Sequence, residues 1–542
     1  VGKADNNGNV LINTVKPLTL SPLLSLAPLF ISGDGGSLIN RLQPEAELAT
    51  LQLQWQDKQF SAAAKVFDMQ WQQSGHVPGL NALDAEFFWY QDHGVLELDA
   101  ADVAFSVDNL LPQDIDLASV KGRAYLFADN NKDWQLWIDK LAVDGELVSF
   151  EQSLRYQFAN KHLSTVLNVS KMPLSKVPQL FPADYMGKGT VSYLNRAFSG
   201  AGEVEQATVI WHGAVDAFPF RQNEGIFQAQ VAIKDAEFTF SRQWPALTEL
   251  SMDLLFENES LYMSSDSSQL QAIQLSNLQA KIPRLAGSSV LSIDANGVGT
   301  GEAVGQLMQA SSMQDSLGKV LTRDVVVDGP LSARLHLDIP LNGEQVSASG
   351  VATLNNNQVT VTSLDLVFAN VQGDIAFDNA NISLEGVTAD LTDQPVTIQL
   401  TGSQLSDEYL LDMHLAGNWA TQPLIERFNP AFNAYLSGRS NWQTDVSVSL
   451  KKDGFQYHAT LNSDLHGVDS RLPLPFNKLS TDLMQLMVLA DGNEQATNVS
   501  VNIGSDVRFN GVLPHAEKQF SRAHLALGDS DFVGLGVGFS IS

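Results

Sequence analysis

Hydrophobic residues recur at every second position in segments spread along the whole chain. Leu51, Leu53 and Trp55, for example, are separated by single glutamines. Because successive side chains of a β-strand point to opposite faces of the sheet, this period predicts strands with one apolar and one polar face. The same alternation marks further strands, whose apolar positions are Phe227, Ala229, Val231 and Ile233; Leu331, Ala333, Leu335, Leu337 and Ile339; Val446 and Val448; and Val499, Val501 and Ile503.

Short turn sequences separate the alternating segments. Asp144-Gly145, Asn342-Gly343 and Asp491-Gly492 contain residue types that accept a positive φ or hydrogen-bond to their own backbone, so each predicts a chain reversal. At about 12 residues for a strand and its turn, the chain holds on the order of 40 strands. The fold class is therefore predicted to be mainly β, with a long, twisted antiparallel sheet curled into an open hydrophobic groove. Such a sheet forms a β-taco-like rod with a few short helices.

Helical spacing of apolar residues is scarce. The clearest case lies within residues 301–321, where Val304, Leu307 and Met308 share one helical face. We expect short helical insertions near residues 20–43, 173–198, 301–321 and 422–437. No Pro-rich or Gly/Ser-rich tract of linker length divides the sequence. We therefore expect residues 1–542 to form a single elongated β-groove body.

Composition narrows the classes of partner. Hydrophobic residues make up 44% of the chain and charged residues 17%, which is enough apolar surface for a large core. The 32 Lys and Arg stand against 61 Asp and Glu, and the formal charge of -29 repels polyanions, so we expect no nucleic-acid partner. The chain has no cysteine. Disulfides and thiolate chemistry are thereby excluded, as expected for a protein of an oxidising cell envelope compartment.

The start of the sequence carries no targeting segment. Residues 1–13 have neither a charged n-region nor an apolar h-region, and no stretch approaches the roughly 20 apolar residues of a membrane span. The first residue is not Met, and it lies within the strand pattern. We expect a fragment of a longer protein whose targeting or anchoring segment lies outside it.

Motifs that carry reactive chemistry are incomplete. Asp129, Asn131 and Asp133 have the opening spacing of a calcium loop, but Trp134 stands where glycine is needed. Gly187-Lys188-Gly189-Thr190 lacks the upstream glycine of a phosphate loop, and the 10 histidines show no His-Glu-x-x-His spacing. We therefore predict no enzyme, no cofactor and no metal site.

Two segments resemble a known family. Residues 211–229 read WHGAVDAFPFRQNEGIFQA, followed by Trp244-Pro245-Ala246, and residues 467–478 read GVDSRLPLPFNK. The first segment is similar to the central signature of the AsmA-like, YhdP-type family, and the second resembles a turn in the C-terminal region of AsmA-like proteins. The resemblance implies a periplasmic protein of a Gram-negative bacterium that is anchored in the inner membrane. It also implies transfer of phospholipid to the outer membrane, which supports lipid homeostasis and the permeability barrier.

A groove would suit such a cargo. Acyl chains resist water at roughly 0.8 kcal/mol per CH₂ group, so a continuous apolar face replaces the bilayer core while headgroups stay in water. We expect the acyl chains to be the partner, with both membranes contacted through regions outside this fragment. The groove-lining candidates are Leu51, Leu53, Trp55, Phe227, Val231, Leu335, Leu337, Val446 and Val448.

Three alternatives remain open from the sequence. The alternating strands could face the core of an ordinary two-layer sandwich. They could also form a structural or adhesive extracellular β-solenoid with no lipid conduit, although regular repeats of fixed length are absent. A glycan-active enzyme with paired carboxylates is the third, and no distinctive motif supports it.

Overall fold

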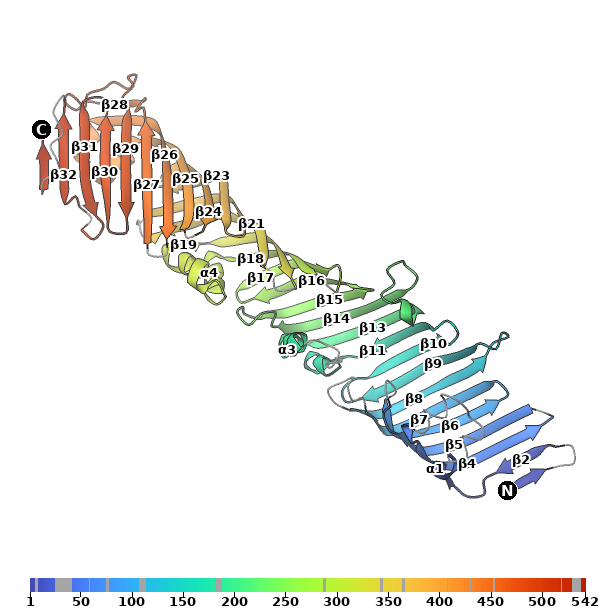
Figure 1. Cartoon of the computed structure of the whole chain (residues 1–542). Helices are drawn as coiled ribbons and strands as arrows, with labels where there is room; N and C mark the ends of the chain where they lie inside the picture. Colours follow the sequence, from blue (N-terminus) through green and yellow to red (C-terminus); the bar gives the residue numbers. More distant parts are fainter. Residues whose placement is uncertain are drawn as a thin grey trace. The chain divides into compact units, whose positions relative to one another are not determined.

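Strands dominate the computed structural model of the chain, and helices are few and short (Figure 1). The prediction of a mainly β fold built from antiparallel strands is confirmed. The structure describes residues 1–4, 8–24, 41–57, 59–74, 78–106, 114–180, 188–285, 289–341, 345–362, 366–406, 408–428, 430–451, 454–517, 519–528 and 538–542.

The chain forms two compact units. Unit 1 comprises Val1–Leu270 and Asn277–Leu291, and unit 2 comprises Gln271–Ser276 and Ser292–Ser542. The strands β17 (Ile273–Ile282) and β18 (Val290–Thr300) have residues in both units. A single elongated body over the whole chain stays a prediction.

Unit 1 is an antiparallel meander. From β4 to β11 each strand pairs with the next one in the sequence, and the series continues from β11 to β13, β14, β15 and β16. The strands are β1 (Gly2–Ala4), β2 (Val10–Asn13), β3 (Leu18–Thr19), β4 (Glu45–Gln56), β5 (Gln59–Trp71), β6 (Gly79–Tyr90), β7 (His93–Ser106), β8 (Ile115–Ala128), β9 (Trp134–Gly145), β10 (Phe150–Gln157), β11 (His162–Val169), β12 (Met172–Pro173), β13 (Glu203–Ala214), β14 (Ile226–Phe238), β15 (Leu247–Glu257) and β16 (Ser260–Leu270).

Unit 2 repeats this plan. The strands from β20 to β27 pair in sequence order, and β29 to β32 continue the antiparallel series, while β33 runs parallel to β32. The strands are β19 (Val325–Asp328), β20 (Pro330–Pro340), β21 (Ser347–Val361), β22 (Leu366–Asp378), β23 (Asn381–Leu391), β24 (Gln394–Leu405), β25 (Glu408–Ala420), β26 (Leu436–Lys451), β27 (Gly454–Ser463), β28 (Val468–Ser470), β29 (Leu486–Asn493), β30 (Ala496–Ile503), β31 (Val507–Pro514), β32 (Arg522–Leu527) and β33 (Gly538–Ile541).

Helices occur within each of the four segments where helical insertions were expected. In unit 1 they are α1 (Leu20–Leu24), η2 (Leu174–Leu180), α3 (Lys188–Ala197) and the single turn η4 (Val215–Ala217). In unit 2 they are α4 (Gly301–Gln309), η5 (Gln314–Gly318), η6 (Val320–Asp324), α5 (Thr421–Phe428) and η8 (Pro430–Ala434). The expected range 20–43 is only partly covered, because residues 25–40 lie outside the described residues.

The apolar positions of successive strands lie opposite one another, so they form continuous rows across the sheet. In unit 1 one row, called here the unit 1 row, contains a single polar residue. It consists of Leu51, Ala64, Phe87, Leu96, Ala124, Ile138, Leu154, Thr165, Trp211 and Phe227. The unit 2 row has no polar residue, and it consists of Ala333, Ala352, Ile375, Leu384, Leu400, Met413, Val446, Ala459, Ala490, Val499, Gly511 and Ala523.

Many strands are interrupted at a similar level by residues with positive φ. We call this level the bulge line, and in unit 1 it includes Asp68, Ala82, Asp102, Asp235 and Glu249. The register shifts at this level between β5 and β6, between β6 and β7, and between β14 and β15. Since a β-bulge bends its strand and increases the local twist, a line of them curves the sheet.

The buried cores lie along the bulge line. In unit 1 one core contains Leu83, Val103 and Val120, and Val103 is only 1% exposed. The core of unit 2 contains Val371 and Val387, which flank the positive-φ residues of β22 and β23. Bending thus packs apolar side chains of one face together at the bulge line and leaves the rest of that face less covered.

The bulge line generates a prediction about stability. Asp102 adopts a φ of 54° in β7, a conformation that aspartate tolerates and a β-branched residue does not. Asp102→Val should therefore lower the free energy of unfolding by roughly 1–2 kcal/mol, measured by urea denaturation. The neighbouring exposed Ala101 is outside the positive-φ set, so Ala101→Val serves as the control. Equal effects of the two substitutions would contradict a strained bulge at this level.

Candidate functional site

In each unit, the residues predicted to line a groove lie on the face of the sheet that carries the buried core of that unit. We call it the apolar face. Cross-strand pairing places them there, since Leu51 lies opposite Ala64, Phe227 opposite Trp211, and Val446 opposite Met413. Unit 1 contributes Leu51, Leu53 and Trp55 from β4 and Phe227 and Val231 from β14; unit 2 contributes Leu335 and Leu337 from β20 and Val446 and Val448 from β26.

None of these nine side chains is fully buried. Eight are half-buried, and Trp55 is 49% exposed. In a two-layer sandwich the inward positions of central strands would be among the most buried residues of the chain. The clusters of fully buried residues lie along the bulge line instead. The apolar face therefore remains accessible on the parts of the bent strands that lie away from the bulge line. This accessibility favours a groove over a sandwich core.

Exposure on the apolar face of unit 1 increases toward one edge of the sheet. Because the strands form a meander, the hairpins β4–β5, β6–β7, β8–β9, β10–β11, β13–β14 and β15–β16 all turn at the same edge, which we call the short-hairpin edge. In β6 the inward residues pass from the buried Leu83 through Ala85 and Phe87 to Trp89, and the last two are half-buried. The apolar face is thus closed near the bulge line and open toward the short-hairpin edge.

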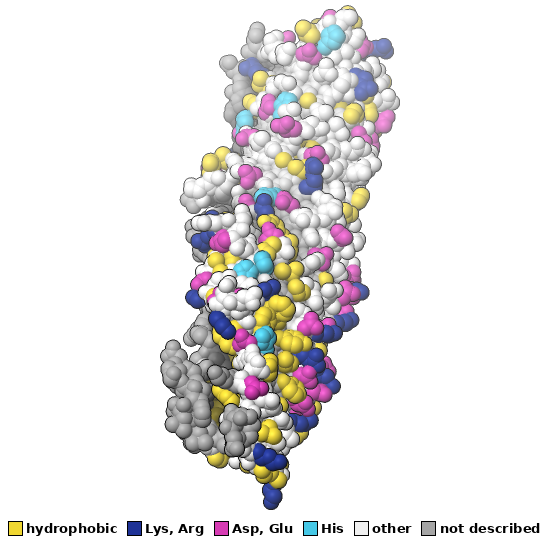
Figure 2. Space-filling model, turned by 90° about the vertical axis from the view of Figure 1, so that its right-hand side faces the viewer, with side chains coloured by type: hydrophobic (Ala, Val, Ile, Leu, Met, Phe, Trp, Pro, Cys, Tyr) yellow, Lys and Arg dark blue, Asp and Glu magenta, His cyan; other side chains and the backbone are white. Residues whose placement is uncertain are grey.

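Aromatic residues are concentrated where the apolar face meets the short-hairpin edge. Trp89 stacks on Trp134 with ring centroids 5.9 Å apart, and Trp211 contacts Phe227 at 5.7 Å. Figure 2, which views the molecule from the right-hand side of Figure 1, shows hydrophobic side chains gathered into a stripe in its lower part, with charged side chains on either side. This part of the view holds unit 1. The stripe marks apolar surface that the strands leave uncovered.

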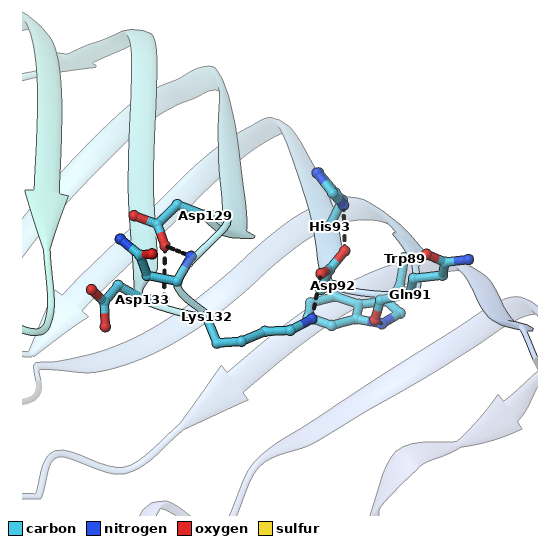
Figure 3. Close-up of polar contacts among 8 residues, drawn as sticks. Trp89, Gln91, Asp92, His93, Asp129, Lys132 and Asp133 are labelled. Carbon is cyan, nitrogen blue, oxygen red and sulfur yellow. Dashed lines mark hydrogen bonds and ion pairs between the residues drawn. The ribbon is translucent and has the colours of Figure 1, made fainter.

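Ion pairs join neighbouring hairpins at the same edge. The Lys132 ammonium of the β8–β9 turn lies 3.4 Å from an Asp92 carboxylate oxygen in the β6–β7 turn, and Figure 3 shows Lys132 reaching across to it. Lys161 donates to Asp216 at 3.0 Å. This hydrogen bond raises the pKa of Lys161 and lowers the pKa of Asp216. Both groups of that pair are therefore charged at neutral pH.

The opposite face of unit 2 is polar and carries its own cross-strand pairs. His414 Nδ1 lies 2.7 Å from an Asp445 oxygen, and His458 makes the same contact with Asp491. His336, on the polar face of β20, has its Nδ1 2.7 Å from an Asp294 oxygen, and this hydrogen bond raises the pKa of His336. These histidines have hydrogen-bond partners on the face opposite the apolar face, so they are poor candidates for a site on the apolar face.

The family-like segment of residues 211–229 forms a packed aromatic corner. Phe220 is 1% exposed and contacts Trp211 edge-to-face at 5.3 Å. A Cβ atom at Gly225 would lie 2.5 Å from the Phe220 ring. The glycine is therefore required by close packing. The corner fixes the β13–β14 hairpin at the short-hairpin edge.

A substitution in this corner tests the packing. Gly225→Ala should displace the Phe220 ring and lower the free energy of unfolding by about 1–3 kcal/mol, the usual cost of overpacking, measured by chemical denaturation. Gly297→Ala is the control, because a Cβ there meets its nearest side chains at an ordinary 3.6 Å. A Gly225→Ala protein as stable as the control protein would refute the packing requirement.

Reactive groups do not converge on the apolar face. Among the described residues no three His, Cys, Asp or Glu side chains lie close enough together to hold a metal ion. No helix in the part of the chain that the structure describes is long and apolar enough to cross a membrane. A hollow of about 870 Å³ in unit 2 is lined mostly by polar residues, which include Gln372, Thr397, Asn418, Asn441 and Gln443, together with the core residues Ala389 and Val396. It is separate from the apolar rows.

The fold and site define a β-rich protein whose sheet carries a continuous apolar row in each unit, and most positions of these rows are only partly buried. Residues 2–540 match the family model described as YhdP protein. The chain is 33% identical over 523 residues to the intermembrane phospholipid transporter YhdP of Escherichia coli (strain K12), and the match covers 94% of this chain and 40% of that protein. The chain belongs to the YhdP family, as the resemblance predicted. It spans about two fifths of the length of the relative, and no solved structure matches it significantly.

Proposed function

We propose that the chain is a conduit segment for phospholipid transfer between two membranes. The observation that carries the proposal is the unit 2 row, in which twelve consecutive positions across the sheet are apolar. The unit 1 row supports it with one polar residue in ten. The name of the E. coli relative, an intermembrane phospholipid transporter, agrees with this cargo.

The energetics of the cargo explain why continuity matters. Each CH₂ group of an acyl chain resists transfer to water by roughly 0.8 kcal/mol, so a lipid leaving a bilayer unprotected faces a barrier of tens of kcal/mol. Successive strands are about 4.8 Å apart. A lipid on the apolar face meets apolar side chains at every strand, so it can advance strand by strand without exposing more apolar surface. One charged residue in the row would interrupt the path.

The proposed setting is the periplasm of a Gram-negative bacterium. Transfer there would run between the inner and the outer membrane, with the anchor in the inner membrane and the membrane contacts supplied by regions outside this chain. The E. coli relative carries the word intermembrane in its name, which fits this compartment. The same comparison disfavours a structural or adhesive β-solenoid. A lipid conduit also works without reactive residues.

Bound lipid tests the conduit most simply. Val488 lies on the apolar face of β29 between Leu461 and Val501, and the adjacent Met487 lies on the other face with 41% of its surface exposed. Val488→Asp should reduce phospholipid retained by the purified chain by at least tenfold, because a carboxylate is costly to desolvate. Native mass spectrometry measures the retained lipid. Met487→Asp should retain lipid like the parent, and equal loss in both variants would argue against the apolar face as the conduit.

Crosslinking inside cells gives a second test. A photoreactive amino acid at Leu337, on the apolar face of β20, should capture phospholipid, since acyl chains are expected to pass it. The same group at the adjacent His336, on the polar face beside Asp294, is the control. Capture only at position 336 would refute the proposed path.

A further inference from the structure

Among the described residues, three ion pairs at the short-hairpin edge of unit 1 each join neighbouring hairpins. They are Lys132 with Asp92 at 3.4 Å, Lys161 with Asp216 at 3.0 Å, and Arg221 with Glu259 at 3.0 Å. The cations come from the consecutive hairpins β8–β9, β10–β11 and β13–β14. Because each hairpin contributes two strands, neighbouring cations are separated by about 10 Å along the sheet.

Each pair lies next to the aromatic end of the apolar face. Trp89 donates from Nε1 to the Gln91 carbonyl in the turn that holds Asp92, and Trp134 follows the turn that holds Lys132. Figure 3 shows Trp89, Gln91 and Asp92 together with Lys132 at this edge. Farther along the edge, Phe218 lies between Asp216 and Arg221 in the sequence. It is 46% exposed, and its ring stacks on Trp211.

Aliphatic, aromatic and charged groups therefore follow one another from the bulge line to the edge. Buried aliphatic side chains lie at the bulge line, half-buried aromatic rings come next, and charged pairs are outermost. A bilayer leaflet has the same order, with hydrocarbon, an interfacial layer that Trp and Tyr favour, and charged headgroups. A phospholipid bound with its tails toward the bulge line would place its headgroup among the ion pairs.

The charges at the edge discriminate between headgroups. Every cation in these pairs is matched by one carboxylate, so an arriving phosphate meets a negative charge 3.0 to 3.4 Å from the cation it needs. A zwitterionic headgroup resolves this conflict, since its phosphate can bind the cation while its amine binds the carboxylate. An anionic headgroup without an amine leaves the carboxylate opposed to the phosphate.

Exchange of partners is physically easy at these positions. The side chains of Lys132, Lys161 and Arg221 are 80%, 62% and 65% exposed. Exposed ion pairs contribute little to stability, so a headgroup can replace them without unfolding the edge. The pairs also remain reachable from water while the tails lie on the apolar face.

We propose that the short-hairpin edge of unit 1 selects phospholipids with zwitterionic headgroups over anionic ones, through Lys132, Lys161 and Arg221 and their partner carboxylates. The inference rests on the proposed function. It adds an orientation, with the headgroups at the short-hairpin edge, and a class of substrate, with a phosphate and an amine in one headgroup.

The test is competition between two lipids with identical acyl chains. The purified chain is incubated with vesicles of equal parts phosphatidylethanolamine and phosphatidylglycerol, reisolated, and its bound lipids are counted by native mass spectrometry. The parent chain should retain the zwitterionic lipid at least threefold over the anionic one. The variant D92N/D216N/E259Q should lose this preference by binding more of the anionic lipid, with total lipid unchanged.

A matched control separates the edge from a general charge effect. The pairs Lys65–Glu86, Arg123–Glu97 and Lys121–Asp99 lie on the face opposite the apolar face and likewise hold two Lys and one Arg against three carboxylates. The variant E86Q/E97Q/D99N therefore removes the same number of carboxylates. This variant should keep the preference of the parent. Equal binding of both lipids by the parent, or an unchanged preference in D92N/D216N/E259Q, would overturn the inference while leaving the conduit intact. A parent chain that retains neither lipid would instead refute the proposed function.

Discussion

Register between neighbouring strands is the constraint on which the apolar face depends. Side chains alternate between faces with a period of two, so a slip of one residue in any strand would move its apolar set to the other face and interrupt every row. In unit 2 the pairing from Ala333 to Ala523 holds this register through twelve strands. Short hairpins maintain it, because the turn between two strands fixes which residues are opposite.

Bulges convert a flat sheet into a site with two different ends. Positive-φ residues such as Asp102 and Glu249 bend the strands, and the apolar side chains nearest the bend pack into cores. Apolar residues farther from the bend, such as Phe87 and Trp89 in β6, are only half-buried. The bulge line thus holds the fold, and we propose that the part of each strand toward the short-hairpin edge binds an apolar ligand.

Much of this arrangement could be predicted from the sequence, because strand alternation is a local property. Spacing alone placed Leu51 and Phe227 of unit 1, and Leu335 and Val446 of unit 2, on the apolar side of their strands, and strand pairing puts each pair on the apolar face of its unit. Their role in lining a groove stays a prediction. The bulge line could not be predicted, since Asp and Glu at positive φ leave no distinct sequence signal. The ion pairs of the edge were also missed, because Lys161 and Asp216 are 55 residues apart and meet only once β10 to β14 are assembled.

Tryptophan quenching tests most directly whether acyl chains lie on the apolar face. Trp211 lies on that face, whereas Trp137 lies on the other face under the Arg155 guanidinium. Two variants, one with Trp211 and the other with Trp137 as its single tryptophan, would be mixed with phospholipid brominated in the middle of its acyl chains. The proposed conduit predicts strong quenching of Trp211 and little of Trp137. Quenching of Trp137 alone, or of neither residue in a chain that binds lipid, would contradict it.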